Sequence, residues 1–177
     1  MFDTVLVAGL GLMGGSMAKT IKARTLSRVL GWNRTRATAE QALADGSIDA
    51  IATDALFREV DLVIIGLYPQ ATVDWLLENM PKMKKGCVIV DMVGVKQFMV
   101  DHLEQAALDA GVHYVGGHPM AGREFSGLDY ALPTLFDGAS MIFVPTKSST
   151  ERVLEQLEAY FMSLGFGQTV RCTAQQH

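Results

Sequence analysis

Short apolar runs alternate along the chain with stretches in which apolar residues recur every three or four positions. Apolar runs of this length are typical of buried strands, and the longer periodic stretches are typical of helices packed on one face. The runs predict strands over residues 4–9, 28–33, 50–52, 61–67, 87–92, 112–117, 140–145 and 167–172. The periodic stretches predict helices over residues 12–25, 35–46, 69–80, 96–110 and 150–164. This alternation, with right-handed crossovers, predicts an α/β fold with a Rossmann-like, doubly wound, mostly parallel sheet.

The first predicted strand runs into the sequence Gly-Leu-Gly-Leu-Met-Gly, which then opens the first helix. Gly9, Gly11 and Gly14 have the spacing of a dinucleotide-binding loop, in the strand–helix context that such a loop requires. Gly9 would permit the tight turn, Gly11 the approach of a diphosphate, and Gly14 the packing of helix on sheet. The diphosphate would lie at the helix N-terminus, beside Leu12 and Met13. The alternative is a glycine-rich turn that binds nothing.

The end of the second predicted strand bears on the choice of cofactor. NAD sites usually have Asp or Glu there, which accepts a hydrogen bond from the ribose, but this chain has Asn33 followed by Arg34 and Thr35. The missing carboxylate removes a repulsion toward a 2′-phosphate, and the Arg34 guanidinium can pair with that phosphate. The sequence therefore favours NADP slightly over NAD. In the alternative, Asn33 bonds the ribose of NAD and Arg34 stacks on adenine.

His118 follows the predicted strand 112–117 within the sequence Gly-Gly-His-Pro-Met-Ala-Gly. Open α/β sheets bind ligands at the carboxyl ends of their strands, so this position predicts a histidine facing the nicotinamide end of the cleft. A neutral imidazole can accept a proton at working pH, which makes His118 a candidate catalytic base. The neighbouring glycines would let the backbone crowd around a substrate. The alternative is a structural loop histidine.

Composition excludes several other classes of protein. The chain has 177 residues, 49% of them hydrophobic and 19% charged, which suits one compact domain. Its net charge of −4 gives no basic surface for nucleic acid or an anionic membrane, and no apolar run approaches the ~20 residues of a transmembrane helix. Cys87 and Cys172 are expected to be buried free thiols, which favours a cytoplasmic protein. The four histidines and two cysteines lack the spacing of metal ligands.

Four segments, GLGLMGGS, DMVGVK, VGGHPMAGREFSG and LFDGASMIFVP, occur in this order and closely resemble the prephenate dehydrogenase family. The resemblance runs from about residue 4 to residue 177, and the histidine segment is its most specific part. Members of this family convert prephenate to 4-hydroxyphenylpyruvate, with hydride transfer to NAD or NADP and loss of CO2, in tyrosine biosynthesis. Some members act on arogenate instead. The resemblance therefore implies an NAD(P)-dependent oxidoreductase that takes one of these substrates.

The resemblance also implies roles for individual residues near the substrate. His118 would bond the ring hydroxyl of prephenate and accept its proton. Glu124 matches a family glutamate that helps to order substrate, and Ser126 completes the same loop. Lys96 and Gly94 match the substrate-side loop after the fifth predicted strand, although many members have at position 94 a serine that bonds the histidine. Without that hydroxyl, a backbone N–H or water replaces it, or His118 is less firmly oriented.

Further residues are expected at the cofactor. Leu67, Tyr68 and Pro69 follow the fourth predicted strand, where the chain usually passes close to the dinucleotide. Asp91 ends the fifth predicted strand and matches the same family loop as Lys96. For Asp91, the alternative is a helix cap.

The resemblance divides the chain into a dinucleotide-binding domain, residues 1–172, and the start of a second domain at residues 173–177. In the family, this all-helical C-terminal domain forms a homodimer, closes the active site and carries an arginine that binds a substrate carboxylate. Because the rest of that domain is absent, we expect the 177 residues alone to turn over poorly. Two alternatives stay open, namely another hydroxyacid or imine-reducing NAD(P) dehydrogenase and a free-standing NAD(P)-binding module that is not an enzyme.

Overall fold

The computed structural model describes residues 2–121 and 126–177. Its strands are β1 (Thr4–Ala8), β2 (Arg28–Trp32), β3 (Ala50–Ile51), β4 (Leu62–Ile65), β5 (Val88–Asp91), β6 (His113–Pro119), β7 (Ser140–Val144) and β8 (Gln168–Arg171). Its α-helices are α1 (Leu12–Arg24), α2 (Arg36–Ala44), α3 (Pro69–Asn79), α4 (Lys96–Ala110) and α5 (Glu151–Ser163). Short 3-10 helices are η1 (Asp54–Glu59), η2 (Met80–Lys82) and η3 (Leu128–Tyr130). The strands and α-helices follow the predicted ranges closely, whereas η1 and η3 lie where no element was predicted.

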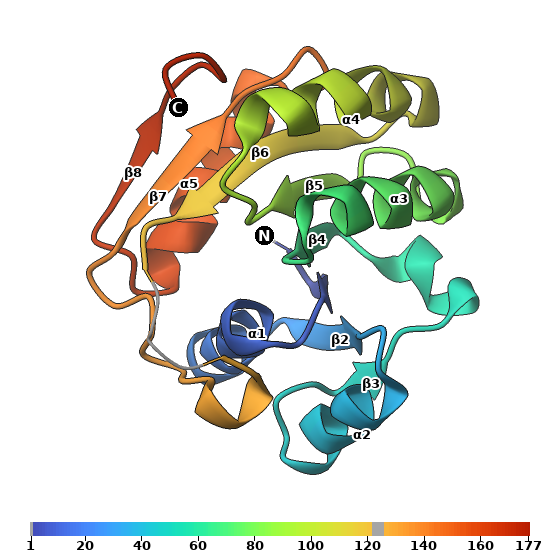
Figure 1. The fold of residues 1–177 in the computed structure, drawn as a ribbon, viewed down its shortest axis with the longest axis vertical. Helices are drawn as coiled ribbons and strands as arrows, with labels where there is room; N and C mark the ends of the chain where they lie inside the picture. The colour runs from blue at the N-terminus through green and yellow to red at the C-terminus, as the bar shows by residue number, and fades with distance from the viewer. Residues whose placement is uncertain (1, 122–125) are drawn as a thin grey trace.

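The strands form one sheet in the order β3-β2-β1-β4-β5-β6-β7-β8 (Figure 1). Every neighbouring pair is parallel except β6 and β7, which run antiparallel. The prediction of a mostly parallel, doubly wound α/β sheet is therefore confirmed. From β1 the chain builds outward through β2 and β3, and it then returns to the other side of β1 with β4. This reversal beside β1 opens a crevice at the carboxyl ends of the strands, where such sheets bind ligands.

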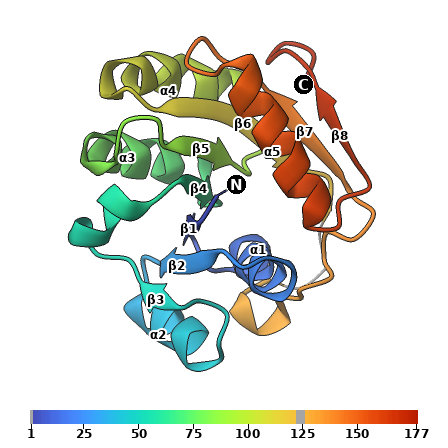
Figure 2. The same ribbon diagram turned by 180° about the vertical axis from the view of Figure 1, so that it is seen from behind.

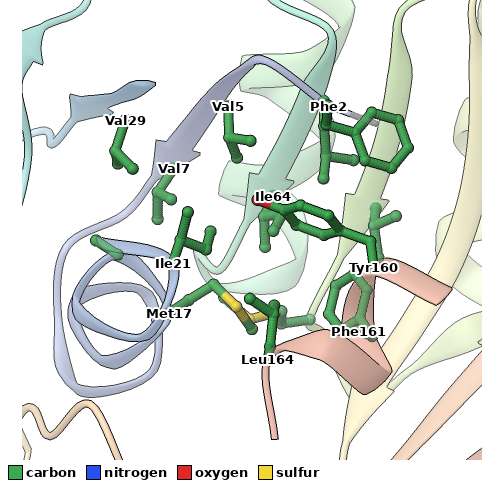
Figure 3. Packing of buried hydrophobic residues seen from close by; sticks show 14 of the residues in the cluster. Phe2, Val5, Val7, Met17, Ile21, Val29, Ile64, Tyr160, Phe161 and Leu164 are labelled. Atoms are coloured by element: carbon green, nitrogen blue, oxygen red, sulfur yellow. The ribbon is translucent and has the colours of Figure 1, made fainter. Parts of the chain in front are cut away.

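Helices cover both faces of the sheet, as the two opposite views show (Figures 1 and 2). Helices α1, α2 and α5 contribute to the apolar cluster on one face, and α3 and α4 to the cluster on the other. In the first cluster, Met17 and Ile21 of α1 point toward Phe161 and Leu164 at the end of α5 (Figure 3). Burial on both faces explains why the central strands are continuously apolar rather than alternating.

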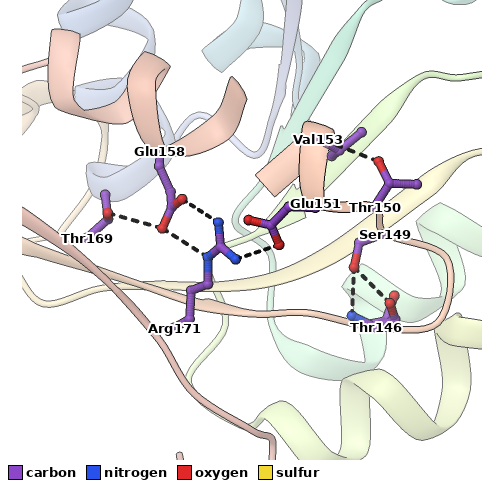
Figure 4. Close-up of polar contacts among 8 residues, drawn as sticks. All are labelled: Thr146, Ser149, Thr150, Glu151, Val153, Glu158, Thr169 and Arg171. Atoms are coloured by element: carbon purple, nitrogen blue, oxygen red, sulfur yellow. Dashed lines mark hydrogen bonds and ion pairs between the residues drawn. The ribbon is translucent and has the colours of Figure 1, made fainter. Parts of the chain in front are cut away.

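A polar clamp fixes the edge strand β8 (Figure 4). The Thr150 hydroxyl caps α5 by accepting a hydrogen bond from the Val153 N–H at 3.2 Å. From β8, the Arg171 guanidinium donates to the carboxylates of Glu151 and Glu158, at 2.9 Å and 2.6 Å. These bonds tie β8 to the first residue and to the middle of α5, so side chains hold the edge strand in addition to its ladder with β7.

Strand β6 differs from the prediction because it continues to Pro119 and so contains His118. Its parallel ladder with β5 ends at Val115, but β7 pairs with the later residues, with Ile142 opposite His118. The expectation that this histidine follows the strand is therefore wrong, since nothing local in the sequence reveals the antiparallel partner. As a consequence, the backbone of His118 is held by a strand ladder.

The thiols and helices bear on two further expectations. Cys87 is buried, as expected, but Cys172 is only half-buried, because it lies just beyond the edge strand β8. Both thiols are free. Among the described residues, no helix is long and apolar enough to span a bilayer.

Candidate functional site

A cleft of about 490 Å³ lies over the carboxyl ends of β1, β2, β4 and β5. It draws its walls from the glycine loop, from the residues that follow β2, β4 and β5, and from the segment before η3. The lining residues are Gly9, Gly11, Leu12, Met13, Asn33, Arg34, Gly66, Leu67, Tyr68, Ala71, Met92, Ser126 and Gly127. The structure thus brings most of the predicted cofactor residues to one cleft, together with Ser126, which the sequence predicts at the substrate.

Glycine is favoured at the three positions of the loop for different physical reasons. Gly9 has a φ of 89°, and a Cβ built on it would lie 2.8 Å from the Gly66 carbonyl oxygen. A Cβ on Gly14 would lie only 1.6 Å from the Gly9 carbonyl oxygen, so Gly14 lets α1 approach β1. A Cβ on Gly11 would meet nothing within 4 Å among the residues that the structure describes. Packing within the chain therefore explains Gly9 and Gly14, whereas Gly11 faces open space in the cleft.

The N-terminus of α1 is open toward this cleft. Gly11 is its N-cap residue, and no described side chain caps the helix or places an acidic group in its first turn. The N–H groups of the first turn, with the positive end of the helix dipole, therefore favour an anionic group beside Leu12 and Met13. This is the geometry expected of a diphosphate site.

Asn33 connects the end of β2 to the glycine loop. Its Oδ1 accepts a hydrogen bond from the Leu10 N–H at 2.9 Å, and its Nδ2 donates to the Thr35 carbonyl at 3.1 Å. Arg34 is exposed at the rim and, over residues 2–121 and 126–177, makes no hydrogen bond or ion pair. Thr35 does not line the cleft; it is the residue before α2. The free cationic group at this end of the cleft is therefore Arg34.

The opposite wall comes from the residues after β4. Tyr68, which is 88% exposed, and Leu67 both line the cleft, and the Leu67 carbonyl accepts a hydrogen bond from the Thr72 hydroxyl at 3.0 Å. Pro69 takes the first position of α3, where its missing N–H is tolerated, and does not line the cleft. Hence Leu67 and Tyr68 face the cleft, and Pro69 positions them by starting the helix.

Sequence reasoning missed Gly66, Ala71 and Met92 as cleft residues. The strand predicted to end at residue 67 ends at Ile65, so Gly66 is the first loop residue. Met92 directly follows β5, and a Cβ on Gly66 would lie 2.8 Å from its Cε. Gly66 and Met92 fall inside the strands predicted over residues 61–67 and 87–92, so finding them required the earlier strand ends at Ile65 and Asp91, which the continuous apolar runs do not mark.

His118 is half-buried, and its ring meets a second histidine at the end of the described chain. Its Nδ1 lies 2.8 Å from Nε2 of His177, with ring centroids 5.0 Å apart. A turn after β8 brings His177 there, and the His177 N–H donates to the Thr173 carbonyl at 3.0 Å. The sequence does not predict this contact, which joins β6 to the turn that follows β8.

The surroundings of His118 favour the uncharged form of its imidazole. Burial lowers its pKa below the usual 6.5, and His177 and then Lys96 lower the pKa further, while Asp91 acts in the opposite direction. Burial and Lys96 also lower the pKa of His177. A neutral imidazole at neutral pH can accept a proton, so the structure supports the chemistry required of a base.

Gly94 lies directly beside this imidazole. A Cβ built on Gly94 would be 3.7 Å from both Cε1 and Nε2 of His118. With Nδ1 engaged by His177, Nε2 is the ring nitrogen left for another partner. Position 94 therefore lies next to Nε2, the ring nitrogen that His177 does not engage.

Asp91 and Lys96 do not line the cleft. Their side chains are wholly buried and bonded to each other, although the sequence predicts contacts with cofactor and substrate. Glu124, the other predicted substrate residue, lies outside the described residues. Within the described parts of the chain, no group of three His, Cys, Asp or Glu side chains is arranged to hold a metal ion.

Domains that begin with this strand–turn–helix and carry a cleft over it form the dinucleotide-binding class found in NAD(P)-dependent dehydrogenases. The present chain has both features at residues 4–24 and in the cleft above them. Residues 17–168 match the family model described as "Prephenate dehydrogenase, nucleotide-binding domain". The chain therefore belongs to the prephenate dehydrogenase family and represents its NAD(P)-binding domain.

Curated relatives agree with this assignment. The chain is 36% identical over 162 residues to prephenate dehydrogenase of Bacillus subtilis, covering 89% of the chain and 43% of the relative. It is 27% identical over 176 residues to prephenate dehydrogenase of Lactococcus lactis, covering 97% of the chain and 49% of the relative. The chain thus spans about half the length of these relatives.

Solved structures show the same fold. Prephenate dehydrogenase from Aquifex aeolicus, in complex with hydroxyphenyl propionate and NAD+, is 25% identical with a TM-score of 0.89, covering 100% of this chain and 62% of that one. Arogenate dehydrogenase from Synechocystis is 26% identical with a TM-score of 0.88, covering 98% of this chain and 61% of that one.

Proposed function

We propose that the chain is the nucleotide-binding part of an enzyme that oxidises and decarboxylates prephenate to 4-hydroxyphenylpyruvate, with transfer of a hydride to NAD(P). The observation that carries the proposal is the half-buried His118, whose ring lies against His177 and Gly94 in a domain of the prephenate dehydrogenase family, although His118 itself does not line the cleft. Arogenate, which differs from prephenate in its side chain rather than in its ring, is the alternative substrate.

The residues of the cleft fit a dinucleotide. Gly11 and the open N-terminus of α1 would hold the diphosphate, and Asn33 with Arg34 would meet the adenosine ribose. Gly66, Leu67 and Met92 would then line the path of the nicotinamide toward β6. When bound, the nicotinamide supplies the hydride acceptor.

His118 would perform the proton chemistry. Its Nε2 would take the proton of the ring hydroxyl as C4 of the substrate loses its hydride, which makes the hydroxyl oxygen a carbonyl. Loss of CO2 then returns an electron pair to the ring, and the protonated His118 can give the proton back to the same oxygen as the ring becomes aromatic. The contact with His177 would hold the ring so that Nε2, rather than Nδ1, faces the substrate.

For the cofactor, we propose a preference for NADP over NAD. Asn33 already uses its amide to hold the glycine loop, and it brings no negative charge to the ribose. Arg34 is exposed and free to pair with a 2′-phosphate bidentately.

Steady-state kinetics of the protein expressed from its complete natural reading frame test the proposal. Prephenate and arogenate are each supplied with NAD+ and with NADP+, and formation of reduced nicotinamide and of CO2 is followed. We expect turnover of at least one substrate, and a loss of roughly 10²–10⁴-fold in kcat for His118→Asn with dinucleotide affinity retained. No reduction with either substrate, or an unchanged rate for His118→Asn, would overturn the proposal.

A further inference from the structure

A buried polar cluster lies directly behind His118, centred on the Asp91 carboxylate. Its Oδ2 accepts hydrogen bonds from the Lys96 ammonium and from the Val93 N–H, the latter at 2.9 Å. Its Oδ1 accepts from the Tyr114 hydroxyl at 2.8 Å and from the Gly117 N–H at 3.3 Å. Both oxygens of one carboxylate are thus used by groups from β6, from the segment after β5 and from the first residue of α4.

This cluster is sealed from solvent. The side chains of Asp91, Lys96 and Tyr114 are all buried. Burial, and then the Asp91 carboxylate, raise the pKa of Tyr114 well above its usual range, so its hydroxyl stays protonated and donates. A buried ion pair is often no more stabilising than apolar side chains of similar volume, since both charges lose their hydration. Fold stability alone therefore does not account for a charged cluster at this place.

The two oxygens of Asp91 reach the two backbone segments that flank the histidine ring. Val93 immediately precedes Gly94, whose Cα faces Cε1 and Nε2 of His118. Gly117 immediately precedes His118 itself. One carboxylate therefore sets the separation between the segment that carries the imidazole and the segment that packs against its reactive nitrogen.

The glycines before the histidine make room for this arrangement. A Cβ on Gly117 would lie 2.4 Å from the Asp91 carbonyl oxygen, and a Cβ on Gly116 would lie 3.0 Å from Cδ of Lys96. Both glycines are buried, so they do not face a substrate. The expectation that these glycines let the backbone crowd around a substrate is therefore wrong for Gly116 and Gly117, which instead admit β5 and the Lys96 side chain.

We propose that Asp91 is a positioning residue for His118, with Lys96 and Tyr114 holding its carboxylate in place between β5 and β6. This inference rests on the proposed function, in which Nε2 of His118 meets the substrate. A shift of the imidazole by about 1 Å can cost up to ~10²-fold in rate even when the moved residue is otherwise intact. Asp91 would thus act on catalysis without touching the substrate or the cofactor.

The test compares Asp91→Asn with the double variant Asp91→Asn/Lys96→Met. The single variant leaves a buried ammonium without its counter-ion and is expected to lose much stability, whereas the double variant removes both charges and recovers stability. Unfolding midpoints and kcat are measured for both, in the protein from its complete reading frame. We expect kcat of the double variant to stay at least roughly tenfold below wild type, with KM for the dinucleotide unchanged. Recovery of kcat together with stability would reduce Asp91 to a structural residue and overturn the proposal.

Tyr114→Phe and an NMR titration keep the test independent of folding and of the proposed reaction. Phenylalanine removes one donor to Asp91 and keeps the buried ring, so we expect a folded protein with a smaller loss of kcat. The NMR signals of the His118 imidazole are recorded as a function of pH in the 177-residue chain. Besides Asp91, the titratable groups His177 and Lys96 act on this imidazole. Altered signals in Tyr114→Phe, which removes a donor to Asp91 without changing a charge, support positioning even if the wild type reduces no nucleotide with prephenate. Signals identical to those of the wild type overturn it.

Discussion

Nδ1 of His118 lies 2.8 Å from Nε2 of His177, although the two residues are 59 positions apart in the chain. Two imidazoles at this distance share one hydrogen bond, in which one ring donates and the other accepts. If both rings were protonated, two positive charges would face each other. The pair therefore favours the neutral form of His118, which is the form that can act as a base.

The first prediction concerns the pKa of His118. Replacing His177 with alanine removes a partner that lowers this pKa, so the pKa of His118 should rise toward its usual 6.5, while burial still holds it below that value. Because the unprotonated base is the active form, the fall in rate on the acidic side of the pH–rate profile should then occur at a higher pH than in the wild type. NMR titration of the imidazole measures the shift. The exposed His102, which bonds the Phe98 carbonyl, provides the control His102→Ala. An unchanged or lowered pKa in His177→Ala would contradict the account.

The second prediction separates the glycines of the loop. Gly11→Ala adds a Cβ into open space, so it should leave the unfolding free energy within about 1 kcal/mol of wild type while weakening dinucleotide binding. Gly14→Ala puts a Cβ 1.6 Å from a carbonyl oxygen and should destabilise the fold itself. Urea unfolding and calorimetric titration with NAD+ and NADP+ measure both effects. Equal losses of stability in the two variants would contradict the assignment of Gly11 to the ligand.

The third prediction concerns cofactor choice. Arg34→Ala should weaken NADP+ binding by about 1.5–3 kcal/mol, the usual contribution of a hydrogen bond to a charged group, and should leave NAD+ binding nearly unchanged. Arg36→Ala is a matched control, because Arg36 is already paired with Glu40 at 3.5 Å. Titration of each variant with both nucleotides gives the two affinities. Equal loss for NAD+ and NADP+ would show that Arg34 does not recognise a 2′-phosphate.

The fourth prediction concerns the glycine beside the imidazole. Gly94→Ser places a hydroxyl next to Nε2 of His118, where a net hydrogen bond of about 1 kcal/mol should raise kcat by roughly fivefold through better orientation of the ring. Gly94→Ala adds the same Cβ without the hydroxyl and should give no increase. Both are measured by steady-state kinetics with the preferred substrate. A decrease in both variants would mean that the space at position 94 is needed by the substrate.

Local patterns predict most of the fold because each buried strand is a continuous apolar run and each helix has its own periodicity. They place β1 and α1 within two residues at each boundary, since the glycine loop marks their junction. The end of β6 is not predicted, because it depends on β7, which is distant in the sequence. Sequence order carries no signal for such a pairing.

For the same reason, the sequence predicts some residues of the candidate site and misses the positions of others. Gly9, Gly11 and Asn33 stand in a motif whose geometry is local, and they line the cleft. The sequence does not tell whether the carboxylate at the end of β5 faces a ligand or the protein interior, and Asp91 faces the interior. The contact of His118 with His177 depends on η3, β7, α5 and β8, which lie between them in the chain, and on the turn after β8, so no spacing rule could indicate it.

The central claim is that a dinucleotide lies over the glycine loop with its nicotinamide near His118. A crystal structure of the chain with bound NADP+, or with NAD+ if its affinity is higher, tests it most directly. The account predicts the diphosphate at the N–H groups of Leu12 and Met13, the adenosine beside Arg34, and the nicotinamide beyond Met92 toward His118. A dinucleotide bound elsewhere, such as the cavity of about 420 Å³ lined by Lys84, Lys85 and Arg152, would contradict it.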